Sequence, residues 1–274
     1  MTYRLEQLTV RHPGSGRAAG QPAALRALDL VVEQGEQLAI IGPSGAGKTT
    51  LLATLACAQR PAEGKFSMFG VDPWALSNDA RHRMRARLFL APQTPPLPPR
   101  QRVVSAVLAA RLPRQSLWQA FASLIKPSDP DAAYAALERF GLGHKLYARV
   151  DRLSGGERQR CALARMLLSS AEVFIVDEPL SALDPTLSQM ALATLQQEAV
   201  SRSATLVCSL HQVDIARAHF PRIVGLRDGQ IMFDLAREQV GDAMIEALYA
   251  NAGNSPPPPA PHETPERLAV GACF

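Results

Sequence analysis

Runs of apolar residues at two different spacings divide this chain into strands and helices. Short apolar or alternating runs predict strands at Leu5–Arg11, Leu28–Glu33, Gln37–Ile41, Arg87–Ala91, Val173–Val176, Thr205–Cys208, Ile223–Leu226 and Gln230–Phe233. Helical spacing predicts helices at Lys48–Ala58, Gly156–Leu168, Thr186–Ser201 and Val213–His219. Strands that alternate with helices favour an α/β domain with a mostly parallel sheet covered by helices.

The pattern changes after Ala91. A proline-rich stretch, PQTPPLPPRQ, is followed by helical spacing alone, at Val103–Leu112, Leu117–Ile125 and Ala132–Phe140. We therefore divide the chain into 1–92 and 153–250, two parts of one core, with a helical subdomain at 93–152 inserted between them. The Gly/Pro/Ala-rich residues 12–22 suggest a hairpin-like connection within an antiparallel N-terminal part. The Pro-rich tail, 251–274, is predicted to be disordered.

Composition narrows the function classes. The net charge is +4, and basic residues cluster at Arg81–Arg87 and Arg158–Arg160. Such clusters favour a solvated helix face over a surface for anionic lipid or a partner. A free nucleic-acid binder usually concentrates more charge on one face, so we expect no nucleic-acid partner. No signal peptide and no run of about 20 apolar residues is found, so any membrane role is expected to run through a partner.

The four cysteines form no motif. Cys57, Cys161, Cys208 and Cys273 are widely separated, which suggests neither a zinc site nor a disulfide framework and fits a reducing cytosol. Three of them lie in apolar runs and are predicted to be buried packing residues.

One glycine-rich segment predicts phosphate binding. Residues 42–49 match G-x-x-x-x-G-K-[ST] at every fixed position, between an apolar strand and a helix. Backbone N–H groups of such a loop and the start of the helix face phosphate oxygens. Lys48 is expected to reach the β- and γ-phosphates and Thr49 to ligate Mg²⁺. The residues expected to hold ATP here are Gly42, Pro43, Ser44, Gly45, Ala46, Gly47, Lys48, Thr49 and Thr50.

Two acids follow a buried strand. Val173–Val176 runs directly into Asp177 and Glu178. In a phosphate-loop fold an Asp at this strand end helps to hold Mg²⁺, and the next Glu can act as general base towards the attacking water. A second consecutive acid favours ATP hydrolysis over a nucleotide-dependent switch.

These motifs together resemble the ABC (ATP-binding cassette) ATPases. Leu153-Ser154-Gly155-Gly156-Glu157 is similar to their LSGGQ signature, and Ser181-Ala182-Leu183-Asp184 resembles their D-loop. Gln93 resembles the Q-loop glutamine and His211 the switch histidine. The order of these motifs matches the family over about residues 5–235, which implies the ABC ATPase core.

The resemblance implies roles for these residues. Ser154, Gly155, Gly156 and Glu157, with Asp184, would contact ATP held by a second copy of the chain, in a head-to-tail dimer. Gln93 would join Thr49 and Asp177 around Mg²⁺. His211 would contact the γ-phosphate beside the catalytic Glu178. His12 occupies the place of the aromatic ring that usually stacks on adenine; Tyr3 is excluded as a substitute because it precedes the predicted first strand.

The segment Arg114–Phe140 and the run Leu210–Asp214 resemble the ATP-binding subunits of phosphonate importers. The resemblance implies membrane permease subunits and, indirectly, a periplasmic binding protein, with the chain peripheral to the cytoplasmic face of the bacterial inner membrane. Phosphite or other organophosphorus compounds fit equally. Two alternatives stay open: the ATPase of another transporter (a polar amino acid importer, or a lipoprotein or lipid exporter), and a non-transport ABC protein.

Overall fold

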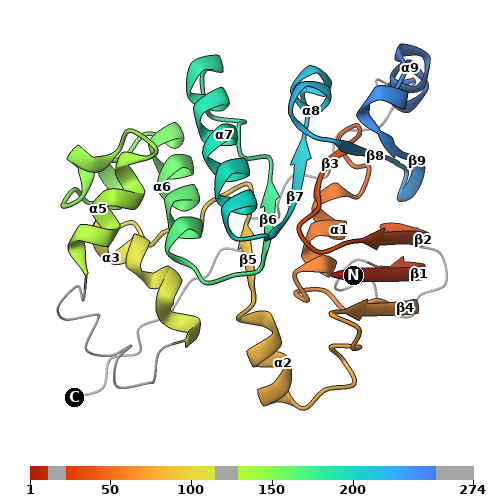
Figure 1. The fold of residues 1–274 in the computed structure, drawn as a ribbon, viewed down its shortest axis with the longest axis horizontal. Coiled ribbons are helices and arrows are strands. Elements are labelled where there is room, and N and C mark those ends of the chain that lie inside the picture. Colours follow the sequence, from red (N-terminus) through yellow and green to blue (C-terminus); the bar gives the residue numbers. More distant parts are fainter. Residues whose placement is uncertain (12–22, 115–128, 251–274) are drawn as a thin grey trace, which may run out of the picture.

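The computed structural model describes residues 1–11, 23–114 and 129–250, with the side chain of Arg114 left out. Its strands form two sheets (Figure 1). The strands are β1 (Tyr3–Val10), β2 (Leu25–Val32), β3 (Gln37–Ile41), β4 (Glu63–Met68), β5 (Leu88–Ala91), β6 (Val173–Asp177), β7 (Thr205–Leu210), β8 (Arg222–Arg227) and β9 (Gln230–Ala236).

The two sheets have different topologies. The small sheet, in the order β2-β1-β4, is antiparallel, which confirms the predicted antiparallel pairing near the N-terminus. The large sheet has the order β5-β6-β7-β3-β8-β9. Its neighbours are parallel from β5 to β8, and β9 is antiparallel to β8. The predicted α/β class with a mostly parallel sheet is confirmed.

The helices surround the large sheet and extend beyond it. The α-helices are α1 (Lys48–Leu55), α2 (Asn78–Arg85), α3 (Val103–Leu108), α5 (Pro130–Glu138), α6 (Gly155–Leu168), α7 (Pro185–Ser201), α8 (Val213–His219) and α9 (Asp242–Tyr249). Short 3-10 helices are η1 (Ala109–Arg114), η2 (Gly143–Lys145), η3 (Val150–Arg152) and η4 (Arg237–Gln239).

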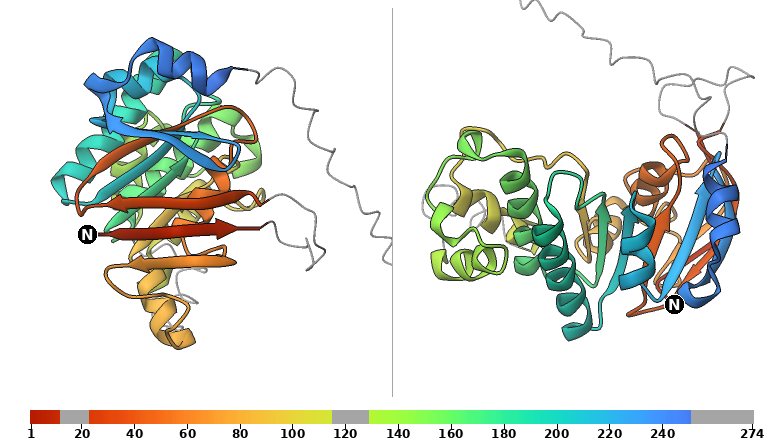
Figure 2. Two further views of the ribbon diagram at one scale, coloured as in Figure 1. Left: turned by 90° about the vertical axis from the view of Figure 1, so that its right-hand side faces the viewer. Right: turned by 90° about the horizontal axis from the view of Figure 1, so that it is seen from above.

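Strict alternation in the central strands explains how one sheet serves two cores. Leu38 and Ile40 of β3 join the core shared with α1 and the small sheet. Ala39 and Ile41 join the core on the other face. Successive side chains of a strand point to opposite faces, so apolar residues at every position require cover on both sides. Helix α1 and the small sheet supply the cover on one face, and helices including α3, α6 and α7 supply it on the other. Figure 2 shows the molecule from two further sides.

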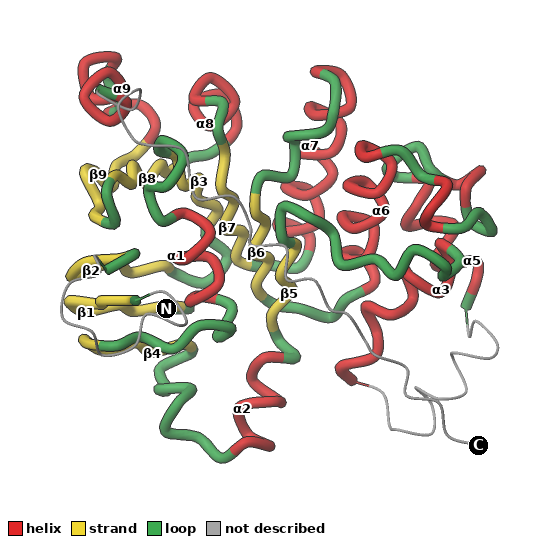
Figure 3. Tube along the Cα trace, turned by 180° about the vertical axis from the view of Figure 1, so that it is seen from behind, coloured by secondary structure: helices red, strands yellow, loops and turns green. Residues whose placement is uncertain are grey.

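The described part of the segment from Gln93 to Arg152 lies at one end of the large sheet and consists of short helices joined by loops (Figure 1). Seen from behind, α3 and α5 pack beside α6, away from the strands (Figure 3). Buried side chains of the three helices, among them Val107, Leu137 and Leu163, belong to one continuous core. The predicted helix at Leu117–Ile125, the connection 12–22 and the tail 251–274 lie outside the described residues.

Besides short 3-10 helices, the described residues contain one strand, β4, and two α-helices, α2 and α9, that the sequence pattern did not predict. Only Phe66 and Met68 of β4 are buried, α2 buries no residue, and α9 buries only Leu248. Such segments carry too few apolar positions for a period to be recognised. Of the basic run Arg81–Arg87, the residues up to Arg85 lie on the exposed α2, whereas Arg87 follows the helix, pairs with Glu172 and lies over the ring of Phe69.

Tyr3 corrects a sequence-based argument. It begins β1 rather than preceding it, and its fully buried ring packs 6.0 Å from that of Phe66. Burial therefore removes Tyr3 from any surface. Cys57, Cys161 and Cys208 are buried as predicted, and none of the helices in the described ranges combines the length and the hydropathy needed to span a bilayer.

Candidate functional site

The loop between β3 and α1 is a backbone cradle. Its first glycine, Gly42, has φ 153°, and a Cβ there would lie 2.0 Å from the carbonyl oxygen of Leu226. Gly47, at φ 102°, begins α1 in the left-handed region. Both positions need glycine, because other residues would be strained or would collide with backbone. The curled loop leaves N–H groups at the start of α1 facing one cavity.

Lys48 lies across this loop. Its Nζ donates to the carbonyl oxygens of Gly42, at 2.8 Å, and Pro43, at 3.2 Å. Burial lowers the pKa of the Lys48 amine, while the nearby Glu178 and Asp177 carboxylates act in the opposite direction. The side chain is thus a buried cation placed between loop carbonyls and two acids.

Thr49 and Asp177 bring two oxygens together at the end of β6. The Thr49 hydroxyl donates to Asp177 Oδ2 at 2.9 Å, and the Ser209 hydroxyl donates to Asp177 Oδ1 at 2.5 Å. Asp177 is only 3% exposed. A hydroxyl beside a carboxylate is the hard-oxygen donor set that Mg²⁺ prefers, so these residues fit the predicted ion.

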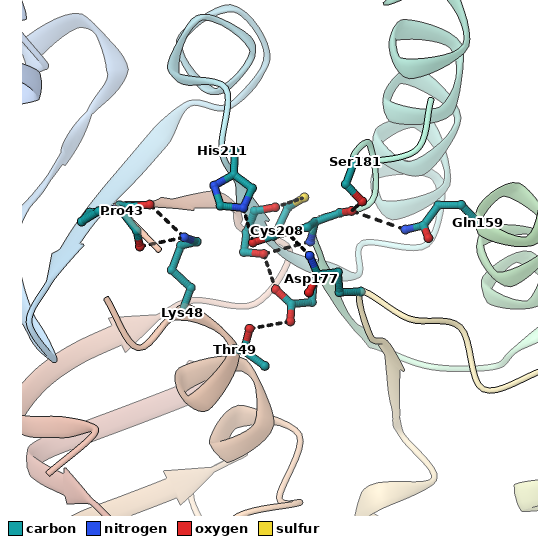
Figure 4. A network of polar contacts seen from close by, with 12 residues as sticks. Pro43, Lys48, Thr49, Gln159, Asp177, Ser181, Cys208 and His211 are labelled. Carbon is teal, nitrogen blue, oxygen red and sulfur yellow. Dashed lines mark hydrogen bonds and ion pairs between the residues drawn. The ribbon is translucent and has the colours of Figure 1, made fainter. Parts of the chain in front are cut away.

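Glu178 is held in an uncommon backbone conformation, φ 49°. Its N–H donates to Ser209 Oγ at 2.9 Å, and its carbonyl accepts from Ser181 Oγ at 3.2 Å and Gln159 Nε2 at 3.4 Å. Its carboxylate accepts from Gln93 Nε2 at 2.6 Å and lies 2.5 Å from His211 Nε2. Figure 4 shows this network converging on the end of β6.

Most residues predicted for the phosphate and catalytic site line one cavity of about 350 Å³, but Gly42, Pro43 and Asp177 are not among its lining residues. Ser44 through Thr50 form one wall, and Gln93, Glu178 and His211 form the opposite side. These groups come from four separate places in the sequence, and the parallel strands bring them together at their carboxyl ends. The cavity combines backbone donors, a cation and a carboxylate that can accept a proton, which is what hydrolysis of a phosphoanhydride requires.

The segment Ser154–Glu157, called the signature loop below, begins α6 elsewhere on the surface. Ser154 Oγ accepts from the Glu157 N–H at 3.1 Å, and Glu157 Oε2 accepts from the Ser154 N–H at 2.8 Å. This reciprocal pair is a capping box. Lys145 lies 3.2 Å from the same carboxylate, and the bond from Ser154 is the main cause of the lowered pKa of Glu157.

The signature loop packs on the segment Ser181–Asp184 of the same chain. A Cβ at Gly156 would lie 2.7 Å from the carbonyl oxygen of Ala182. Asp184 caps α7 by accepting from the Leu187 N–H at 2.9 Å. Ser154–Gly156 and Asp184 therefore lie outside the cavity of their own chain, and Gly156 packs against Ala182 and Leu183.

Sequence reasoning missed Ser209, Gln159 and Ser181 as part of this network. Ser209 is fully buried inside an apolar strand and Gln159 is 4% exposed. A polar residue within an apolar run is the signal that could have identified Ser209. Gln159 lies between Arg158 and Arg160, so its neighbours in the sequence carry no such signal. His12 lies outside the described residues, so its proposed contact with adenine stays a prediction.

Comparison with known proteins agrees with this geometry. The ABC transporter family model matches residues 25–181. The chain is 58% identical over 250 residues, 91% of this chain and 90% of the relative, to the phosphonates import ATP-binding protein PhnC 2 of Albidiferax ferrireducens. It is 55% identical to PhnC of a Polaromonas species over 91% of this chain and 90% of that protein.

Solved structures show the same fold. A dimeric ATP-binding cassette in a post-hydrolysis state, bound to ADP and Pi, matches with a TM-score of 0.73 at 24% identity, over 86% of this chain and 98% of that one. An ATP-binding subunit of an ABC transporter matches with a TM-score of 0.72 at 23% identity, over 92% and 100% of the two chains. The predicted resemblance is confirmed: the chain belongs to the ABC transporter family and has the fold of its ATP-binding cassettes.

Proposed function

We propose that this chain hydrolyses ATP to ADP and phosphate and thereby energises the import of phosphonates or related organophosphorus anions. The observation that carries the ATPase assignment is the cavity that places Glu178 opposite the loop of Lys48 and Thr49. The transported class is supported by relatives at 50–58% identity, each of which is a phosphonates import ATP-binding protein.

ATP binding falls to the loop from Gly42 to Thr50. N–H groups at the start of α1 and the Lys48 amine supply positive charge towards the phosphate oxygens. Lys48 would exchange its bonds to the carbonyls of Gly42 and Pro43 for the β- and γ-phosphates. His12 is our candidate for stacking on adenine, and because imidazole is a smaller surface than a tyrosine ring, base selectivity would be modest.

Thr49, Asp177 and Gln93 would hold magnesium. The hydroxyl and carboxylate oxygens are already 2.9 Å apart, and the Gln93 side chain lies against Glu178. When bound, magnesium neutralises negative charge on the β- and γ-phosphates.

Hydrolysis requires a base next to the γ-phosphate. The Glu178 carboxylate would take a proton from water as the water oxygen bonds to the γ-phosphorus and the bond from that phosphorus to the bridging oxygen breaks. His211, 2.5 Å from Glu178, would orient the carboxylate and stabilise charge on the transferred group.

The complete site is shared between two copies. The sequence has one phosphate loop and one signature loop, and the structure keeps the two apart within one chain. In a head-to-tail dimer, Ser154, Gly155, Gly156, Glu157 and Asp184 of one copy would complete the cavity of the other. The solved cassette with ADP and Pi is itself dimeric, which supports this arrangement.

Transport would need further partners. We expect permease subunits in the membrane, a periplasmic binding protein that acts through them, and a peripheral location for this chain on the cytoplasmic face of the inner membrane. The helical part, 93–152, would pass closure of the dimer to the permease. We expect no role for nucleic acid.

Glu178→Gln tests the ATPase assignment. The amide cannot accept the proton, so turnover should fall by about 10²–10⁴-fold while ATP binding persists. Hydrolysis is measured by phosphate release and binding by equilibrium dialysis. Near-normal hydrolysis would refute the role of Glu178.

A deletion strain tests the transported class. Growth with a phosphonate as sole phosphorus source should be lost and should return with the wild-type chain but not with Glu178→Gln. Normal growth of a strain lacking every other phosphonate importer would point instead to another transporter, such as one for polar amino acids or lipids.

A further inference from the structure

The carbonyl oxygen of Glu178 accepts hydrogen bonds from two side chains that have no role in the proposed chemistry. Gln159, from α6, donates to this carbonyl at 3.4 Å, and Ser181, from the loop after β6, donates at 3.2 Å. The labelled Gln159 and Ser181 approach it from two sides in Figure 4. Neither side chain lines the cavity of the phosphate loop.

Glu178 needs such support. Its φ of 49° lies in the left-handed region, which costs a residue with a Cβ about 1–2 kcal/mol and persists only where the surroundings impose it. The conformation decides where the chain turns after β6, and so where the carboxylate lies relative to Lys48 and Thr49. The Glu178 N–H donates to Ser209 Oγ and its carbonyl accepts from Gln159 Nε2, so hydrogen bonds hold this backbone conformation on both sides.

Gln159 is the one of these donors that belongs to α6. It lies five residues after Ser154 in a continuous helix, Gly155–Leu168. Its side chain is 4% exposed, so the amide must find its partners within the protein. A rigid helix thus carries the signature loop at its first turn and a hydrogen bond to the backbone of Glu178 in its second.

We propose that Gln159 is a positioning residue for Glu178, through which the helix that begins at the signature loop sets the placement of the general base in the chain's own site. The inference rests on the proposed ATPase function. When nucleotide held by a second copy binds Ser154, it acts on the helix whose Gln159 holds the backbone of Glu178. Nucleotide binding in the second copy's site is thereby linked to the position of the general base in the chain's own site.

Gln159→Met tests this, since methionine has a similar length and volume but no donor. Turnover should fall about tenfold, because small displacements of a catalytic group can cost up to about 100-fold, while KM for ATP stays within about twofold. The matched control is Gln196→Met. Gln196 Nε2 donates to the carbonyl of His219 at 2.7 Å and to Gln37 Oε1 at 3.2 Å, and none of these three residues lines the phosphate-loop cavity, so turnover should not change.

The diagnostic measurement is a double-mutant cycle with Glu178→Gln. If Gln159 acts through Glu178, its replacement should cause no further loss of residual turnover once the base is gone. Losses that multiply would overturn the proposal. A normal rate for Glu178→Gln alone is a different result, because it would refute the proposed function rather than this inference.

A second readout separates positioning from dimer closure. In the Glu178→Gln background, ATP-dependent dimerisation, measured by size-exclusion chromatography with light scattering, should survive Gln159→Met. Loss of the dimer would assign Gln159 to closure and overturn the positioning role. Should Gln159→Met fail to fold, Gln159→Leu carries the same expectations.

Discussion

Two helices of this molecule begin at loops that we propose to hold phosphate, and the two beginnings are built differently. Helix α1 follows Gly47, which has no side chain, so among the described residues no side chain caps it. Helix α6 begins with a capping box in which Ser154 and Glu157 satisfy each other's N–H groups. The first loop leaves its donors for a ligand, and the second has already used part of its own.

This difference indicates that the starts of α1 and α6 have different roles. The loop of α1 also holds the buried Lys48 cation, so under the proposed function it would bind the phosphates of one chain's nucleotide by itself. At α6, the Ser154 hydroxyl accepts from Glu157 N–H and keeps its own hydrogen for a further acceptor. We therefore expect the signature loop to be stable in a single chain and to contribute less to nucleotide binding when, as proposed, a second copy closes on it.

Replacing Lys48 with methionine should show the largest effect. The loop would keep its shape but lose the cation that faces the phosphates, so turnover should fall by about 100-fold or more, as for loss of a charge that stabilises the transition state. ATP affinity should fall as well. Phosphate release and equilibrium dialysis measure the two, and unchanged affinity would show that the α1 loop holds phosphate by its N–H groups alone.

Ser154→Ala should affect turnover but not ATP binding by one copy. Loss of one contact made only in the closed dimer should lower turnover about 10-fold or more, and loss of the cap should destabilise the fold by about 1 kcal/mol. Ser154→Asp separates these effects, because Asp caps well but repels phosphate. It should restore stability in urea unfolding and leave turnover low. Recovered turnover in Ser154→Asp would reduce the signature loop to a cap.

Gly156→Ala tests whether the packing of the signature loop on Ala182 requires a glycine. The new Cβ would lie 2.7 Å from the carbonyl oxygen of Ala182, so that loop must shift, at a cost of about 1–3 kcal/mol. Gly155→Ala is the control, because a Cβ there meets nothing within 4 Å. Urea unfolding measures both. Equal stabilities would mean that only helix propensity, which favours alanine, is acting.

Glu157→Ala should have the smallest effect and a defined pH dependence. Loss of half of the capping box should cost about 1 kcal/mol at pH 7. The pKa of Glu157 is lowered in the folded chain from its ordinary 4.5. Its contribution is therefore full above that value and lost as pH falls through the folded pKa. The difference from wild type should shrink below pH 4.5, whereas Glu157→Gln, which keeps the side-chain acceptor, should stay near wild type at pH 7.

Only some of the candidate site residues could be predicted from the sequence alone. The phosphate loop and the acids Asp177 and Glu178 were predictable, because the chemistry fixes their spacing along the chain. Ser209 and Gln159 were not singled out, because their roles arise from contacts between elements distant in sequence. Strand β3 and helix α8 have the predicted bounds, since continuous apolar or periodic runs define them. Helix α2, with no buried residue, has no such pattern to recognise.

The order of strands in the large sheet has a consequence for how the chain folds during synthesis. Strand β3, which leads into the phosphate loop, pairs on one side with β7 and on the other with β8. A nascent chain that ends before Thr205 contains β3 but neither neighbour. Pairings this distant in sequence form late and slowly. The strand before the phosphate loop therefore gains a sheet neighbour on both sides only after β8, which ends at Arg227, has been synthesised.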